Sequence, residues 1–210
     1  MELGENKQVR KHSTRANRHN TKYTLLRLPL CRKRKEVYHR PMRKKEAKAA
    51  NYAFIDGQNL HKAIKELGWD LDYRRFRVYL KEKYAVEKAF ILMGFIPTNA
   101  DLYAALQSYG FILIFKPILQ YKDGLVKGNI DADLVLHAMI ELKNYAQAVI
   151  VSGDGDFHSL VKYLREEGKL KILLAPNQKR YSVLLNSAAG DKIAFISAQR
   201  KKLQYKKAPH

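Results

Sequence analysis

Acidic residues cluster at three points of the sequence where apolar segments end or helical patterns begin. Two of these points follow short apolar runs, and the third opens an amphipathic stretch. A set of carboxylate oxygens suits Mg²⁺ or Mn²⁺ rather than zinc. A divalent ion held by them could activate water and neutralise charge on a phosphodiester. The residues concerned are Asp56, Asp131, Asp133, Asp154 and Asp156.

Each of these aspartates also has an ordinary structural explanation, because Asp is a favoured N-cap residue of helices. Capping uses one side-chain oxygen per helix, however, and does not explain two aspartates on either side of Gly155. Several carboxylates at one place repel one another unless a cation is present. We therefore favour a metal site over a set of unrelated caps.

The elements that must position these residues alternate along the chain. Apolar runs predict strands, and amphipathic runs between them predict helices. The expected strands cover residues 52–56, 88–95, 111–119, 147–153, 169–176 and 192–197, and the expected helices cover residues 57–67, 72–84, 99–109, 130–146, 156–167 and 182–189. Strands that are apolar on both faces and alternate with helices indicate a mostly parallel sheet. The predicted fold class is α/β, a three-layer α/β/α Rossmann-like sandwich.

In such folds, ligands bind at the carboxyl edge of the sheet. A helix that leads into a parallel strand begins at that edge, which places the start of the 130–146 helix there. At 3.6 residues per turn, Asp131 falls in line with the sheet-facing Leu134 and Ala138, whereas Asp133 points nearly opposite. Asp131 is therefore the expected metal ligand, and Asp133 is the second choice.

Two further residues near these positions could contact a substrate. Ser152 could donate to a phosphate or to water near the metal, or it could only satisfy a local turn. Lys127 lies in a glycine-containing segment before Asp131 and could hold a phosphate, or it could belong to an ordinary solvated loop.

The charge is distributed unevenly along the 210 residues. Residues 1–50 hold 16 Lys and Arg against 4 Asp and Glu, a net charge of +12, and residues 199–210 add +5 of the total +20. We expect a basic extension (1–50) that is disordered by itself, a nearly neutral domain (51–198) and a basic tail (199–210). Such extensions favour a polyanionic partner such as nucleic acid, and the alternative is an extension that only adds solubility.

The composition also excludes several classes of protein. The single cysteine, Cys31, rules out a disulfide framework and a cysteine-built zinc site. No apolar run approaches the length of about 20 residues that a membrane span needs. We expect a cytoplasmic protein with no membrane partner, and a homodimer is one assembly that we consider.

Three segments resemble a known family. FIDGQN, KGNIDADLVLHAMI and VSGDGDF, in this order within residues 51–198, resemble the NYN domain, the LabA-like branch of the PIN-like nuclease superfamily. The resemblance implies a PIN-like fold and a ribonuclease site that uses Mg²⁺ or Mn²⁺. It implies metal and catalytic roles for Asp56, Asp131, Asp154 and Asp156, with Asn59 assisting substrate positioning. His137 stands where many members carry another Asp, which leaves the number of metal ions open.

The leading hypothesis is a metal-dependent endoribonuclease in RNA processing or turnover. The alternative is a non-catalytic RNA-binding or regulatory protein that uses the same fold. A phosphatase of the haloacid-dehalogenase type is disfavoured, because Asp56 is followed by Gly57 and Gln58 without the second aspartate that its nucleophile motif needs.

Overall fold

Six parallel strands form one sheet in the computed structural model, which describes residues 50–116, 119–120, 126–127 and 131–206. The strand order is β3-β2-β1-β6-β7-β8. The strands are β1 (Asn51–Asp56), β2 (Val86–Gly94), β3 (Phe111–Lys116), β6 (Ala148–Val151), β7 (Leu170–Ala175) and β8 (Ile193–Phe195). A separate antiparallel pair, β4 (Leu119–Gln120) and β5 (Val126–Lys127), follows β3 in the sequence.

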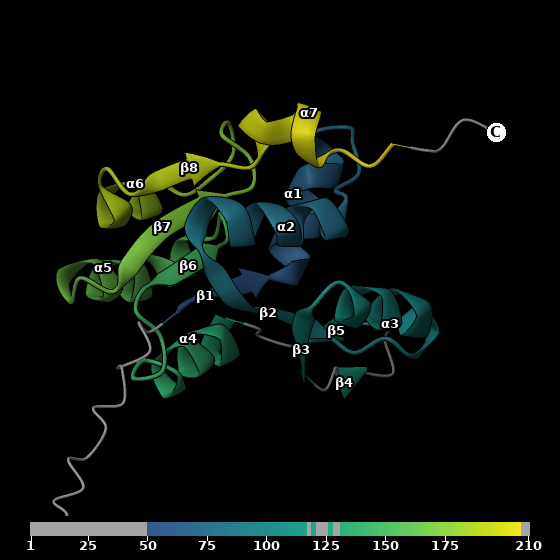
Figure 1. The fold of residues 1–210 in the computed structure, drawn as a ribbon, viewed down its shortest axis with the longest axis horizontal. Coiled ribbons are helices and arrows are strands. Elements are labelled where there is room, and N and C mark those ends of the chain that lie inside the picture. The colour runs from purple at the N-terminus through teal and green to yellow at the C-terminus, as the bar shows by residue number, and fades with distance from the viewer. Residues whose placement is uncertain (1–49, 117–118, 121–125, 128–130, 207–210) are drawn as a thin grey trace, which may run out of the picture. The chain divides into compact units, whose positions relative to one another are not determined.

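Helices cover both faces of the sheet (Figure 1). Side chains of α4 (Asp131–Ile140), α5 (His158–Glu166) and α6 (Val183–Ala189) pack on one face. Side chains of α1 (Gly57–Glu66), α2 (Tyr73–Tyr84), α3 (Ala100–Ser108) and α7 (Arg200–Leu203) pack on the other. Short 3₁₀ turns are η1 (Pro97–Asn99), η2 (Gly155–Phe157) and η3 (Ser197–Gln199). The predicted three-layer α/β/α sandwich is confirmed.

The central strands are apolar on both faces because each face is covered. Along β1, Tyr52 and Phe54 enter the core beneath α4 and α5, while Ala53 and Ile55 enter the core beneath α1 and α2. All four side chains are buried. This two-sided burial explains why the strand is a continuous apolar run rather than an alternating one.

The direction in which the chain adds strands to the sheet reverses between β1 and β6. From β1 the chain moves outward through β2 to β3, and from β6 it moves outward the other way to β7 and β8. The carboxyl ends of β1 and β6 lie side by side, with Ile55 level with Val151. This is the switch point at which α/β sheets bind their ligands.

Glycine is required where α1 starts at this point. A Cβ atom on Gly57 would lie 2.9 Å from Cγ2 of Ile91 and 3.0 Å from the carbonyl oxygen of Leu92. Only a residue without a side chain therefore lets α1 begin directly after Asp56 against β2.

Two sequence predictions need correction. The helix expected over 130–146 ends at Ile140, and turns carry the chain to Tyr145, which is buried and donates a hydrogen bond from Oη to the carbonyl oxygen of Ala138 (3.0 Å). The strand expected over 111–119 ends at Lys116. Most of the basic extension predicted over residues 1–50 lies outside the described residues.

The domain also extends beyond the boundary predicted at residue 198. Residues 200–203 form α7, Leu203 is 1% exposed, and Gln204 forms an antiparallel bridge with Leu71. A single buried leucine among lysines and arginines produces no hydrophobic period, which is why the sequence assigned this segment to a tail.

Replacing Leu203 by Ala should lower the free energy of unfolding by about 2–3 kcal/mol, because the side chain is fully buried against α2 and its neighbours. Val183→Ala is the matched control, because Val183 is 80% exposed and its truncation should cost no more than about 0.5 kcal/mol. Equal losses for the two variants in denaturant unfolding would contradict the place of α7 in the core.

Candidate metal centre

Three aspartates from two parts of the chain converge at the carboxyl edge of the sheet. One carboxylate oxygen from each of Asp131, Asp154 and Asp156 lies within 4.8 Å of the other two. Asp131 and Asp154 are half-buried, and Asp156 is exposed. The three side chains thus form a patch that solvent can reach.

The local structure of each segment explains this convergence. Asp131 is the first residue of α4, which begins at the carboxyl edge and precedes β6. Asp154 caps η2, because its Oδ1 accepts a hydrogen bond from the backbone N–H of Asp156 (3.1 Å). That short turn places both aspartates of the pair beside the start of α4. Capping and clustering therefore occur together at Asp154.

Position 155, between Asp154 and Asp156, is occupied by glycine for a steric reason. A Cβ atom at this position would lie 2.5 Å from Oγ of Ser182, which begins α6 after β7. The loop after β7 therefore presses against η2. A larger residue at position 155 would require Ser182 or η2 to shift.

Asp56 lies behind this group and is 4% exposed. Its Oδ1 accepts a hydrogen bond from the N–H of Asn59 (2.9 Å), and its Oδ2 accepts one from the hydroxyl of Ser152 (3.3 Å). Asp56 is thus the N-cap of α1 as well as a neighbour of the cluster. It is not a member of the three-oxygen group found among the described residues, and its role as a ligand stays a prediction.

Ser152 and Asn59 connect β1 and α1 to the loop that follows β6. The hydroxyl of Ser152 accepts from the N–H of Asp154 (3.1 Å), and Oδ1 of Asn59 accepts from the N–H of Gly153 (2.9 Å). Ser152 is fully buried, and its hydroxyl contacts Asp56 and Asp154, so its contact with a phosphate stays a prediction. Of the two roles considered for Ser152, the local turn is the one that these contacts describe.

The electrostatics of the site follow from burial and from the neighbouring carboxylates. Burial raises the pKa of Asp56 to about 6, with smaller upward contributions from Asp131 and Asp154 and downward ones from the hydrogen bonds of Asn59 and Ser152. Burial also raises the pKa of Asp131, and the charges of Asp154 and Asp156 raise it further. Each carboxylate makes ionisation of its neighbours harder, which a cation would reverse.

Lys116 provides positive charge at the rim of the site. Its Nζ lies 3.2 Å from Oδ2 of Asp133, and its charge lowers the pKa of Asp131. Asp133, the second choice as a ligand, is thus paired with Lys116, while Asp131 belongs to the cluster. Sequence reasoning missed Lys116, although it is the last residue of β3 and the rule for carboxyl edges applies to it as well.

The remaining predicted residue is Lys127, which ends β5. Its side chain lies outside the described residues, so its phosphate-binding role stays a prediction.

The donor set fits a hard divalent cation. All nearby acidic ligands are carboxylate oxygens, with no cysteine or histidine in the three-residue group. Such a set suits Mg²⁺ or Mn²⁺, both of which retain water ligands beside a few carboxylates.

Within the described residues, no helix is long and apolar enough to cross a membrane.

Comparison with known proteins places these residues in a family. The model of the NYN domain matches residues 52–194. This range contains all four aspartates that the sequence assigned to the metal, together with Asn59 and Ser152.

A curated relative and a solved structure are among the proteins that are similar to the chain. The low amplitude and bright protein LabA of Synechococcus elongatus is 28% identical over 122 residues, which cover 53% of this chain and 66% of LabA, slightly less than two thirds of its length. The crystal structure of a protein of unknown function from Vibrio parahaemolyticus covers 77% of this chain and 99% of its own, with a TM-score of 0.63 and 23% identity. At that identity, the second similarity supports the fold alone.

The raised pKa of Asp56 predicts that stability depends on pH in the absence of divalent ions. The pKa is about 6 in the folded protein against 3.8 for an ordinary Asp, so stability is greatest below pH 3.8 and falls as pH rises through 6. The difference corresponds to about 3 kcal/mol. With chelator present, Asp56→Asn should therefore be more stable than the wild type at neutral pH, by up to that amount, and similar to it near pH 4.

Asp72→Asn is the matched control for this measurement, because Asp72 also caps a helix by accepting from the N–H of Arg75 (3.0 Å). Denaturant unfolding across this pH range measures all three proteins. A wild-type profile parallel to that of Asp56→Asn would contradict the buried, hard-to-ionise carboxyl.

Proposed function

The chain belongs to the NYN domain family, whose members are generally nucleases, and from this premise we propose that it is a ribonuclease dependent on Mg²⁺ or Mn²⁺. The observation that carries the proposal is the convergence of Asp131, Asp154 and Asp156 at the switch point of the sheet. The reaction is hydrolysis of an RNA phosphodiester, with endonucleolytic cleavage in RNA processing or turnover as the specific form.

The residues of the site divide the work between binding and positioning. Asp131, Asp154 and Asp156 would hold the ion, and Asp56 would complete the negative site from the side of β1. When bound, a divalent ion supplies polarisation of the phosphodiester and activation of water. Ser152 fixes Asp56 relative to the backbone of Asp154, and Asn59 holds the N–H of Gly153. These contacts keep the aspartates in place before substrate arrives.

RNA is the proposed substrate because of where the positive charge lies. Residues 1–50 carry a net charge of +12, and residues 199–210 carry +5, while the aspartates form a negative site within the domain. Cationic segments attract the phosphate backbone without reading its sequence. They would raise the local concentration of RNA at a site whose own charge repels it.

Asp154→Asn should strongly reduce cleavage of RNA in the presence of Mn²⁺ or Mg²⁺, because it removes a charged metal ligand while its Oδ1 can still accept from the N–H of Asp156. The expected loss is about a hundredfold or more, since even residues that merely support metal ligands contribute roughly ten- to a hundredfold. Gel analysis of labelled RNAs measures the rate, and a chelator should silence the wild type.

Asp131→Asn and Asp133→Asn form a matched pair within one helix turn. The first should lose activity as Asp154→Asn does, whereas the second, which removes the partner of Lys116, should retain most of it. If RNA binds but no divalent ion supports its cleavage, the protein is a non-catalytic RNA-binding protein and not a nuclease.

Neutralising Arg32, Lys33, Arg34 and Lys35 by Gln should weaken RNA binding and flatten its salt dependence. Each lost phosphate contact with single-stranded RNA lowers the slope of log K against log salt by about 0.7, so the four changes together predict a decrease of up to about 2.8. Fluorescence anisotropy over a salt series provides the slope. An unchanged slope would show that these four residues of the basic extension do not contact RNA.

A further inference from the structure

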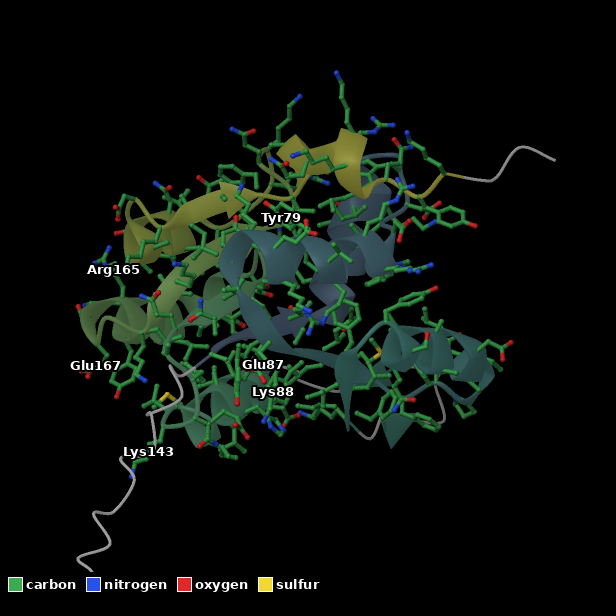
Figure 2. All side chains as sticks on the ribbon, viewed as in Figure 1. Tyr79, Glu87, Lys88, Lys143, Arg165 and Glu167 are labelled. Atoms are coloured by element: carbon green, nitrogen blue, oxygen red, sulfur yellow. The ribbon has the colours of Figure 1, made fainter. Side chains whose placement is uncertain are left out.

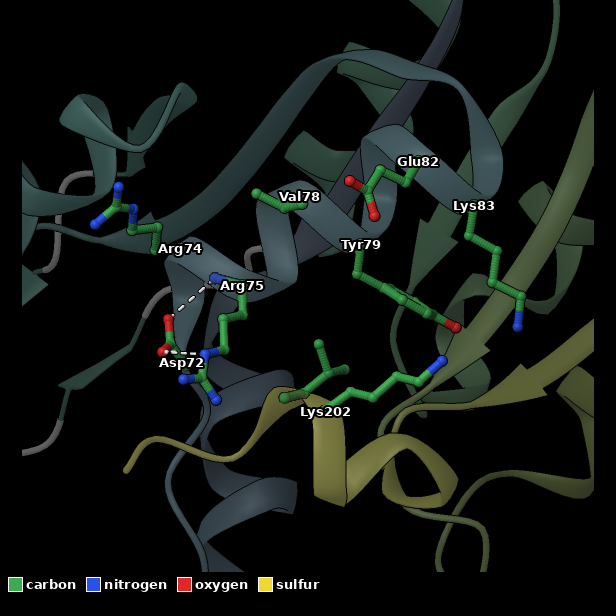
Figure 3. A pocket seen from close by; sticks show the side chains of 9 residues that line it. Asp72, Arg74, Arg75, Val78, Tyr79, Glu82, Lys83 and Lys202 are labelled. Carbon is green, nitrogen blue, oxygen red and sulfur yellow. Dashed lines mark hydrogen bonds and ion pairs between the residues drawn. The ribbon is translucent and has the colours of Figure 1, made fainter. Parts of the chain in front are cut away.

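A groove of about 710 Å³ lies between α2 and α7, on the helical layer opposite α4 (Figure 3). It is not formed by any of the aspartates of the metal centre. Its walls carry Arg74, Arg75, Tyr79 and Lys83 from α2 and Lys202 from α7.

The charge of the groove is positive. Four cationic side chains line it against two carboxylates, Asp72 and Glu82. Asp72 is already engaged by Arg75, because Oδ1 accepts from the N–H of Arg75 (3.0 Å) and Oδ2 lies 3.2 Å from its Nε. Figure 3 shows the carboxylate of Glu82 directed away from the ammonium groups of Lys83 and Lys202.

Those two ammonium groups converge from opposite walls. Figure 3 shows Lys83 and Lys202 extending toward the hydroxyl end of Tyr79. The Nζ of Lys83 lies 5.4 Å from the centre of the Tyr79 ring, and Oη of Tyr79 lies 3.3 Å from Oη of Tyr84. Two like charges that face one place repel each other, and an anion between them would relieve this repulsion. The tyrosine hydroxyl adds a hydrogen-bonding group beside them.

The groove is long as well as basic. Its lining on α2 extends from Asp72, the N-cap, to Lys83. At 1.5 Å per residue, this length is about 17 Å, which exceeds the size of one phosphate group. Cations occur at both ends: Arg74 lies near the start of α2 beside the Arg75–Asp72 pair, and Lys83 lies near the end of α2 with Lys202 facing it from α7. A chain of phosphates matches this distribution better than a single anion does.

We propose that the groove between α2 and α7 binds the phosphate backbone of single-stranded RNA, with one phosphate held between Lys83 and Lys202. The inference rests on the proposed function for its choice of RNA as the polyanion. It adds a second contact surface within the folded domain, separate from the aspartates and from residues 1–50.

The test compares Lys83→Gln/Lys202→Gln with Lys143→Gln/Lys171→Gln in the full-length chain. Lys143 and Lys171 are also exposed. Figure 2 shows Lys143 beyond the end of α4, on the other side of the view from Tyr79 on α2. Both double variants remove the same charge. Binding of a labelled single-stranded oligouridylate is measured by anisotropy with chelator present, over a salt series.

The groove variant should bind about tenfold more weakly than the control variant, and its salt slope should fall by about 0.7 because the contact with the one phosphate between the two lysines is lost. Equal affinities and slopes for the two variants, or no RNA binding by the wild type, would overturn the proposal. Inorganic phosphate is titrated in parallel. Binding of phosphate that depends on these lysines, without an effect on RNA, would assign the groove to a free anion instead. Thermal melting should be the same for all proteins.

This design separates the groove from the nuclease. Because binding is measured without divalent ions, RNA that binds through the groove but is never cleaved leaves this inference intact and overturns the proposed activity. RNA that is cleaved while the groove variant binds like the control gives the opposite result.

Discussion

The carboxylates of Asp131, Asp154 and Asp156 repel one another, and the parallel sheet nevertheless holds them within 4.8 Å at its switch point. This proximity follows from topology, because β1, β6 and the start of α4 all meet at one edge. The hydrogen bonds of Asp56, Ser152 and Asn59 hold the surrounding backbone against the repulsion. The site is thus organised by the protein itself, and a cation placed there would relieve the repulsion between the carboxylates.

The distribution of charge over the chain complements this local excess of negative charge. Almost all of the net charge of +20 lies near the two ends of the sequence, and the middle of the chain is nearly neutral. Within the folded part, basic side chains gather on α2 and α7, and Lys116 stands at the rim of the aspartates. Among the described residues, the basic groove and the aspartate cluster therefore lie on different elements of the fold.

Much of this arrangement could be predicted from the sequence, and the reasons are specific. Continuous apolar runs identified the six main strands, and helical geometry distinguished Asp131 from Asp133. The end of α4 at Ile140, the burial of Leu203 and the pairing of Lys116 with Asp133 could not be predicted. Each depends on which distant element covers a side chain, and such contacts leave no local period. The hydrogen bonds of Ser152 escaped for the same reason, since its partners are 96 residues away in one case.

The contacts of Asn59 and Ser152 have a consequence for the motions of the domain. The amide hydrogens of Gly153 and Asp154 are bonded to side chains rather than to a neighbouring strand. Asn59 belongs to the first turn of α1, so fraying of that turn also releases Gly153. Opening of the first turn of α1 and loosening of the loop after β6 are then one cooperative event. Exchange of these two amides with solvent would therefore occur together, and it would slow together when an ion or a substrate ties the loop down.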